Sequence, residues 1–189
     1  MKKLAVLFPG VGYTCGKPLL YYTGALAAEK GYETVALDYG QDVHSFRGRT
    51  AKELEPVIEL ALERCLPKLL QIPWKEYGSV LFISKSIGTV VACRAAGKLP
   101  CHPRHFLMTP IEATLSWLDR AEGMFVAGSA DPYLDQGLLF RAVEMFPEKV
   151  GRLFPGCNHS LERKNDTLGN IHNLTQVLEC LETMLIEEE

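Results

Sequence analysis

Residues 80–92 read Val80-Leu81-Phe82-Ile83-Ser84-Lys85-Ser86-Ile87-Gly88-Thr89-Val90-Val91-Ala92. An apolar run typical of a buried strand is followed by a short polar turn and then by a segment that we expect to be helical. This order is typical of a nucleophile elbow, in which a serine lies at the tip of a tight strand-to-helix turn. Ser86 would be that serine, with the small residues Ser84 and Gly88 where strand and helix cross. The pattern also fits a serine that only caps the helix, because Ser is a favoured N-cap residue.

The composition is that of a soluble globular protein. The chain has 189 residues, of which 47% are hydrophobic and 23% charged, and this predicts a single domain over 1–189. The chain has a net charge of −3, whereas a nucleic-acid-binding protein usually carries an excess of basic residues. No nucleic-acid partner is therefore expected. The apolar run after Lys3 ends at Pro9-Gly10, too early for a signal peptide, and no stretch approaches the ~20 apolar residues of a membrane span. We therefore expect a cytoplasmic protein without a membrane partner.

The cysteines do not indicate a disulfide framework or a metal site. They are scattered without a C-x-x-C pair, which favours free thiols in a chain without a secretory signal. Cys101, His102 and His105 lie close in sequence, but no second cluster supplies the remaining ligands of a zinc site. No metal is expected.

The loop that follows the first apolar run resembles two phosphate-binding motifs without matching either. Aligned on Gly16-Lys17, the chain has Val11 and Pro18 where the Walker A motif requires Gly and Ser or Thr. Cys15 stands where the dinucleotide fingerprint G-x-G-x-x-G requires its third glycine. We therefore expect no nucleotide and no other cofactor.

Short apolar segments alternate with amphipathic ones along the whole chain. We predict strands at 3–8, 34–37, 79–84, 105–109, 123–127 and 149–154. We predict helices at 17–30, 50–70, 87–99, 133–145 and 167–185, the second of which begins with the capping-box spacing of Thr50 and Glu53. This pattern predicts an α/β fold, a three-layer αβα sandwich around a mostly parallel six-stranded sheet. Residues 110–122 are too few to form a cap domain.

Three residues that could act together follow three of the predicted strands. Parallel strands present their carboxyl ends at one edge of a sheet, where ligands bind. Ser86, Asp131 and His159 all lie in segments at that edge. A serine becomes a useful nucleophile when a histidine takes its proton and a carboxylate orients the histidine. Asp135 is the rival acid, but it lies inside a predicted helix. This convergence favours Ser86 as the nucleophile over Ser86 as a helix cap.

Backbone N–H groups near the serine could stabilise an oxyanion. One would come from Ile87, directly after the serine, and the other from the loop after the first strand, where Val11 is the first choice and Gly12 the second. Lys85 could place a positive charge near an anionic substrate, but we expect its side chain to be solvated beside the site.

The chain resembles the α/β-hydrolase superfamily, and within it the small lidless dienelactone-hydrolase-like and serine-esterase branches. The similarity covers nearly the whole chain and rests on Pro9-Gly10-x-Gly12, Ser84-x-Ser86-x-Gly88, Gly128-x-x-Asp131 and Asn158-His159-Ser160-Leu161-Glu162. The order Ser…Asp…His is also that of the superfamily. The chain departs from the family pattern by Ser84 in place of the usual glycine and by the absence of the first two strands.

The resemblance implies a serine hydrolase that cleaves a carboxylic ester or thioester through a Ser-His-Asp triad and an acyl-enzyme. Its partner would be a small-molecule acyl substrate. The alternative is a catalytically silent protein of the same fold that binds a ligand or a partner. The presence of all three triad residue types on consistent loops argues against this alternative.

Overall fold

A computed structural model describes residues 1–47 and 50–186. Its strands form one sheet in the order β2-β1-β3-β4-β5-β6. Every neighbouring pair in this sheet is parallel. The strands are β1 (Lys2–Phe8), β2 (Tyr32–Ala36), β3 (Tyr77–Lys85), β4 (Arg104–Met108), β5 (Gly123–Gly128) and β6 (Val150–Phe154). The prediction of a six-stranded α/β sandwich is confirmed.

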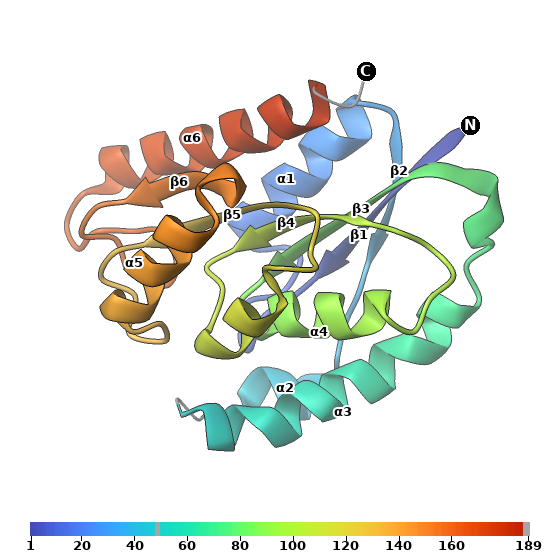
Figure 1. The fold of residues 1–189 in the computed structure, drawn as a ribbon, viewed down its shortest axis with the longest axis horizontal. Coiled ribbons are helices and arrows are strands. Elements are labelled where there is room, and N and C mark those ends of the chain that lie inside the picture. The colour runs from blue at the N-terminus through green and yellow to red at the C-terminus, as the bar shows by residue number, and fades with distance from the viewer. Residues whose placement is uncertain (48–49, 187–189) are drawn as a thin grey trace.

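Helices cover both faces of the sheet (Figure 1). One face packs against α1 (Pro18–Glu29) and α6 (Thr167–Ile186). The other face packs against α3 (Ala51–Leu70), α4 (Ile87–Ala96) and α5 (Gln136–Met145). The remaining elements are the short helix α2 (Gln41–Ser45) and the 3₁₀ helices η1 (Trp74–Glu76), η2 (Glu112–Trp117) and η3 (Pro147–Lys149).

The strands are apolar on both sides because both faces of the sheet are covered. In β1, Leu4 and Val6 pack into the core under α3 and α4, whereas Ala5 and Leu7 pack into the core under α1 and α6. The alternation of strand side chains thus divides one apolar run between two cores. None of the helices in the described part of the chain is long and apolar enough to cross a membrane.

The capping box expected at the start of α3 is present. The Thr50 N–H donates to Glu53 Oε2 at 2.9 Å, and the Glu53 N–H donates to Thr50 Oγ1 at 3.3 Å. Other boundaries differ from the prediction. Helix α5 begins three residues late, at Gln136, because Asp135 caps it by accepting from the Leu138 N–H at 3.0 Å. Helix α2 was not predicted, since five residues are too short to show a helical period.

Candidate active site

Ser86 lies in a sharp turn between β3 and α4. Its backbone has φ 58° and ψ −128°, a conformation that a residue with a side chain adopts only under strain. The Ser86 N–H donates to Met108 O at 3.1 Å, and Ser86 O accepts from Thr89 Oγ1 at 2.6 Å. The Ser86 side chain makes no capping hydrogen bond to α4. Ser86 thus occupies the N-cap position of α4, but its hydroxyl does not cap the helix and is directed at another partner.

Gly88 allows α4 to cross β1 closely. A Cβ atom at this position would lie 2.4 Å from Phe8 O and 2.5 Å from Pro9 O. Both are backbone atoms, one in the last residue of β1 and one directly after it, so they cannot move aside as a flexible side chain could. The small residue expected two positions after the serine is thus required by the backbone of a neighbouring strand.

The Gly88→Ala variant is expected to lower the free energy of unfolding by about 1–3 kcal/mol, the usual cost of forcing extra atoms into a packed site. Urea unfolding followed by circular dichroism measures this change. Gly97→Ala, at the other end of α4, is the matched control, because a Cβ there meets its nearest atom, Arg94 O, at 3.7 Å. Equal stability of the two variants would contradict the close crossing.

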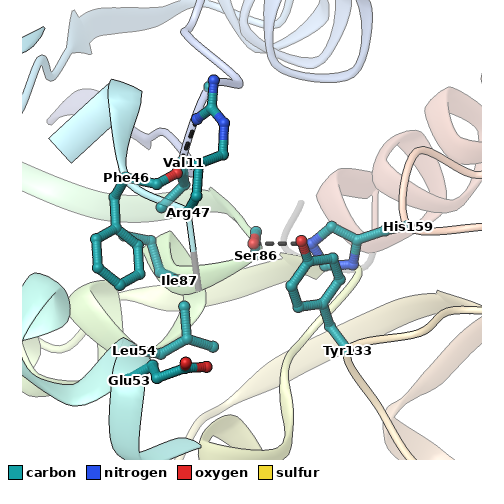
Figure 2. Close-up of a pocket in the computed structure, with 10 residues that line it drawn as sticks. Val11, Phe46, Arg47, Glu53, Leu54, Ser86, Ile87, Tyr133 and His159 are labelled. Carbon is teal, nitrogen blue, oxygen red and sulfur yellow. Dashed lines mark hydrogen bonds between the residues drawn. The ribbon is translucent and has the colours of Figure 1, made fainter. Parts of the chain in front are cut away.

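The structure brings Ser86, His159 and Asp131 together in one hydrogen-bonded series. His159 Nε2 lies 2.8 Å from Ser86 Oγ (Figure 2), and His159 Nδ1 lies 2.7 Å from Asp131 Oδ2. An ionised carboxylate can only accept, so Nδ1–H donates to Asp131 and Nε2 is left to accept the Ser86 O–H. The three residues follow β3, β5 and β6, as the sequence predicted. The arrangement can take a proton from the serine and hold the resulting imidazolium.

Asp131 uses both carboxylate oxygens. Oδ2 faces His159, and Oδ1 accepts from the Tyr133 N–H at 2.9 Å. The Tyr133 ring also packs on the imidazole of His159, with the ring centroids 4.5 Å apart. The rival Asp135 caps α5 instead. The role of Tyr133 was not predicted from the sequence, because this residue lies in the first turn of the helix predicted at 133–145.

The loop that carries His159 is held by its own Asn158. Asn158 Oδ1 accepts from the N–H groups of Ser160 at 2.7 Å and Glu162 at 3.2 Å. The loop is also joined to the Asp131 loop, since the Ala130 N–H donates to Cys157 O at 3.0 Å. Asn158 belongs to the motif Asn158-His159-Ser160-Leu161-Glu162, but this role was not predicted from the sequence. An Asn directly before the histidine is the signal that could have shown it, since Asn side chains commonly bond nearby backbone.

The residues predicted to bind an oxyanion lie beside Ser86. Gly10 and Tyr13 exchange two backbone hydrogen bonds, at 3.0 and 3.4 Å, which leave Val11 and Gly12 at the tip of the turn. Both tip residues line a cavity together with Ser86, Ile87 and His159. No residue in the described part of the chain accepts from the N–H groups of Val11, Gly12 or Ile87. These three donors are thus available to a bound group.

The cavity next to Ser86 has a volume of about 600 Å³. Its wall opposite His159 and Tyr133 comes from the residues that follow α2 and from the start of α3, and Ser86 lies between the two sides (Figure 2). This wall consists of Phe46, Arg47, Glu53 and Leu54. Phe46 and Arg47 could not be assigned from the sequence, because they lie between the strand predicted at 34–37 and the helix predicted at 50–70. Glu53 and Leu54 lie in that predicted helix, and only the structure shows that they also line the cavity. The wall combines apolar and charged side chains and can accept a small organic group.

The side chain of Lys85 is buried, contrary to the expectation from the sequence. We expected its side chain to be solvated, but only 1% of the residue is exposed. Burial lowers the pKa of Lys85 to about 7, against the opposing effect of the Asp131 and Glu162 carboxylates. Burial also lowers the pKa of His159, and the Lys85 charge lowers it further, whereas Asp131 raises it. Burial and the Lys85 charge thus favour the neutral imidazole, the form that can accept a proton.

Comparison with known proteins supports the fold and not a particular activity. No protein-family model matches the chain, and no curated protein matches it by sequence. An alpha-beta serine hydrolase homologue from Coxiella burnetii is 14% identical, with 94% of this chain and 84% of that chain covered and a TM-score of 0.63. A dienelactone hydrolase from Anabaena variabilis is 16% identical, with 98% and 86% covered and a TM-score of 0.62.

A member of the α/β serine hydrolases without a lid, from Xanthomonas campestris, is 15% identical, with 95% of this chain and 81% of that chain covered and a TM-score of 0.58. The likeness to these three structures extends over almost the whole chain. At such identities it shows a shared fold, because one fold can carry many activities. The chain has the α/β-hydrolase fold.

Proposed function

We propose that this chain, whose fold is that of the α/β hydrolases, is a serine hydrolase that cleaves a carboxylic ester or thioester of a small molecule. The observation that carries the proposal is the hydrogen-bonded series of Asp131, His159 and Ser86, with Ser86 in a strained turn. Strained backbone and residues with a shifted pKa occur preferentially at functional sites, and both features are present here. The named neighbours of similar fold, which include hydrolases, support the same class of activity.

In the proposed reaction, His159 Nε2 takes the proton of Ser86 as Oγ attacks the acyl carbonyl carbon. The carbonyl oxygen gains negative charge and receives hydrogen bonds from the N–H groups of Ile87 and of Val11 or Gly12. His159 then gives its proton to the leaving oxygen or sulfur, which departs and leaves Ser86 acylated. Water, deprotonated by His159, attacks the acyl-enzyme and releases the acid.

The proposed substrate is small, or is a group that protrudes from a larger molecule. The segment between β4 and β5 contains the 3₁₀ helix η2 and no inserted cap. The cavity of about 600 Å³ lies within the range of small-ligand pockets. Phe46 and Leu54 offer apolar contacts to an acyl or alcohol group. This wall favours short acyl esters and thioesters over long lipid chains.

Labelling with a fluorophosphonate probe tests the proposal. The folded protein is expected to become covalently modified in one-to-one ratio, and mass spectrometry is expected to locate the adduct on the peptide that contains Ser86. Heat-denatured protein is the control, because the reaction depends on His159 and not on the serine alone. A folded protein that neither reacts nor hydrolyses p-nitrophenyl esters or thioesters of varied chain length would overturn the proposal. That result would favour a silent binding protein of the same fold.

A further inference from the structure

A buried lysine lies directly under the histidine loop, and the proposed reaction does not use it. Lys85 is the last residue of β3, and its side chain leaves the sheet on the face opposite to that of Ser84, since side chains alternate along a strand. A buried amine is costly unless its protons are bonded. An apolar residue at this position would avoid that cost. The presence of a lysine therefore suggests that the contacts of its amine have a function.

The contacts of Lys85 Nζ join two distant loops. Nζ donates to the backbone oxygen of His159 at 3.0 Å, although the two residues are 74 positions apart in sequence. It also lies over the ring of Tyr13, 4.4 Å from the ring centroid. The hydroxyl of Tyr13 in turn accepts from the Leu19 N–H at 3.0 Å, which holds the ring against the start of α1. Lys85 thus connects the elbow strand to the histidine itself.

The charged and titratable groups that face Lys85 come from each loop packed around it. Tyr13 belongs to the loop after β1, Asp131 to the loop after β5, and His159 and Glu162 to the loop after β6. The two carboxylates favour the charged ammonium, and burial opposes it. The ammonium in turn disfavours a second positive charge on His159.

We propose that Lys85 is a positioning residue for the histidine: its ammonium group holds the His159 carbonyl and so fixes the imidazole between Asp131 and Ser86. The proposal rests on the proposed serine hydrolase function for its catalytic consequence. Its structural content, a lysine whose amine is bonded to the backbone of His159, can be tested without a substrate.

The expected sign of the pH effect follows from the two positive charges. Lys85, with a pKa of about 7, is protonated at the lower pH at which His159 takes up its proton. The charge already present makes the second proton less favourable, so it lowers the pKa of His159. Removal of the amine should raise this pKa. The acid limb of the pH–rate profile, where activity falls because His159 becomes protonated, should then move to higher pH.

NMR titration of the His159 imidazole gives the first measurement. In the wild-type protein the midpoint is expected below about 6.5, the ordinary value for histidine. In Lys85→Met the midpoint is expected to move upward. A Lys85→Met midpoint that stays or falls overturns the proposal. This comparison needs no substrate, so it tests the proposal even if the protein proves to have no esterase activity.

Kinetics with an ester that the wild type cleaves gives the second measurement. Lys85→Met is expected to lower kcat about 10- to 100-fold with little change in KM, because a small misplacement of a catalytic group costs rate at that scale. Lys149→Met is the matched control. Lys149 also donates to backbone oxygens, those of Leu118 and Ala121, but outside the cavity next to Ser86. Equal rates and equal pH profiles for the two variants would overturn the role of Lys85.

Discussion

Ser86→Ala is expected to abolish fluorophosphonate labelling and to lower ester hydrolysis by about 10⁶-fold in kcat, the scale seen when a triad nucleophile is removed. Alanine has no oxygen to attack the carbonyl carbon, and the neighbouring His159 then has no proton to take. Stability should change little, because the Ser86 side chain does not cap α4 and the turn is held by backbone contacts to Met108 and Thr89. Stopped assays on the same ester and a labelling gel measure both effects.

Ser84→Ala is the matched control for this loss. Ser84 is fully buried two residues before Ser86, and its Oγ has no hydrogen-bond partner among the described residues. Removal of an unpaired buried hydroxyl is close to neutral for stability. Ser84→Ala should therefore label and hydrolyse like the wild type. A Ser86→Ala protein that still reacts with the probe would place the nucleophile elsewhere in the chain.

Asp131→Asn is expected to lower kcat by about 10⁴-fold while the fold is kept, as for other triads in which the acid becomes an amide. Asp131 accepts from the Tyr133 N–H with Oδ1 and faces His159 with Oδ2, but an amide has a single oxygen. If that oxygen stays with Tyr133, the NH₂ group faces His159 Nδ1 and selects the tautomer that carries its proton on Nε2. Such an imidazole cannot take the proton of Ser86.

Asp135→Asn provides the control for this second loss. Asp135 caps α5 through the Leu138 N–H, and asparagine is an equally good N-cap. The rate of ester hydrolysis and the free energy of unfolding of Asp135→Asn should match those of the wild type. Steady-state rates of the two variants, compared at equal helix content by circular dichroism, decide between the two carboxylates. A loss with Asp135→Asn and normal activity with Asp131→Asn would move the acid assignment to Asp135.

The strands and the long helices could be predicted because the patterns that indicate them, apolar runs and capping residues, involve residues close together in sequence. Each strand of this sheet is buried on both faces and therefore appears as a short apolar run, as in β1 and β3. The start of α3 follows from Thr50 and Glu53, whose side chains bond within one turn. Helix α2 and the cavity-wall residues Phe46 and Arg47 that follow it could not be predicted, since so few residues show no helical period. The late start of α5 reflects a cap by Asp135, one of several polar residues that could have capped it.

The sequence by itself determined which residues meet at the carboxyl edge of the sheet. Parallel strands all end at one edge, so Ser86, Asp131 and His159 had to lie there together once each followed its own strand. Only the tertiary structure decided the state of Lys85. A lysine at the end of an apolar strand is solvated or buried according to which loops cover it, and these loops are those that carry Tyr13 and His159. Contacts between segments so far apart in the chain arise from the packing of the whole sheet. They cannot be predicted from a local sequence pattern.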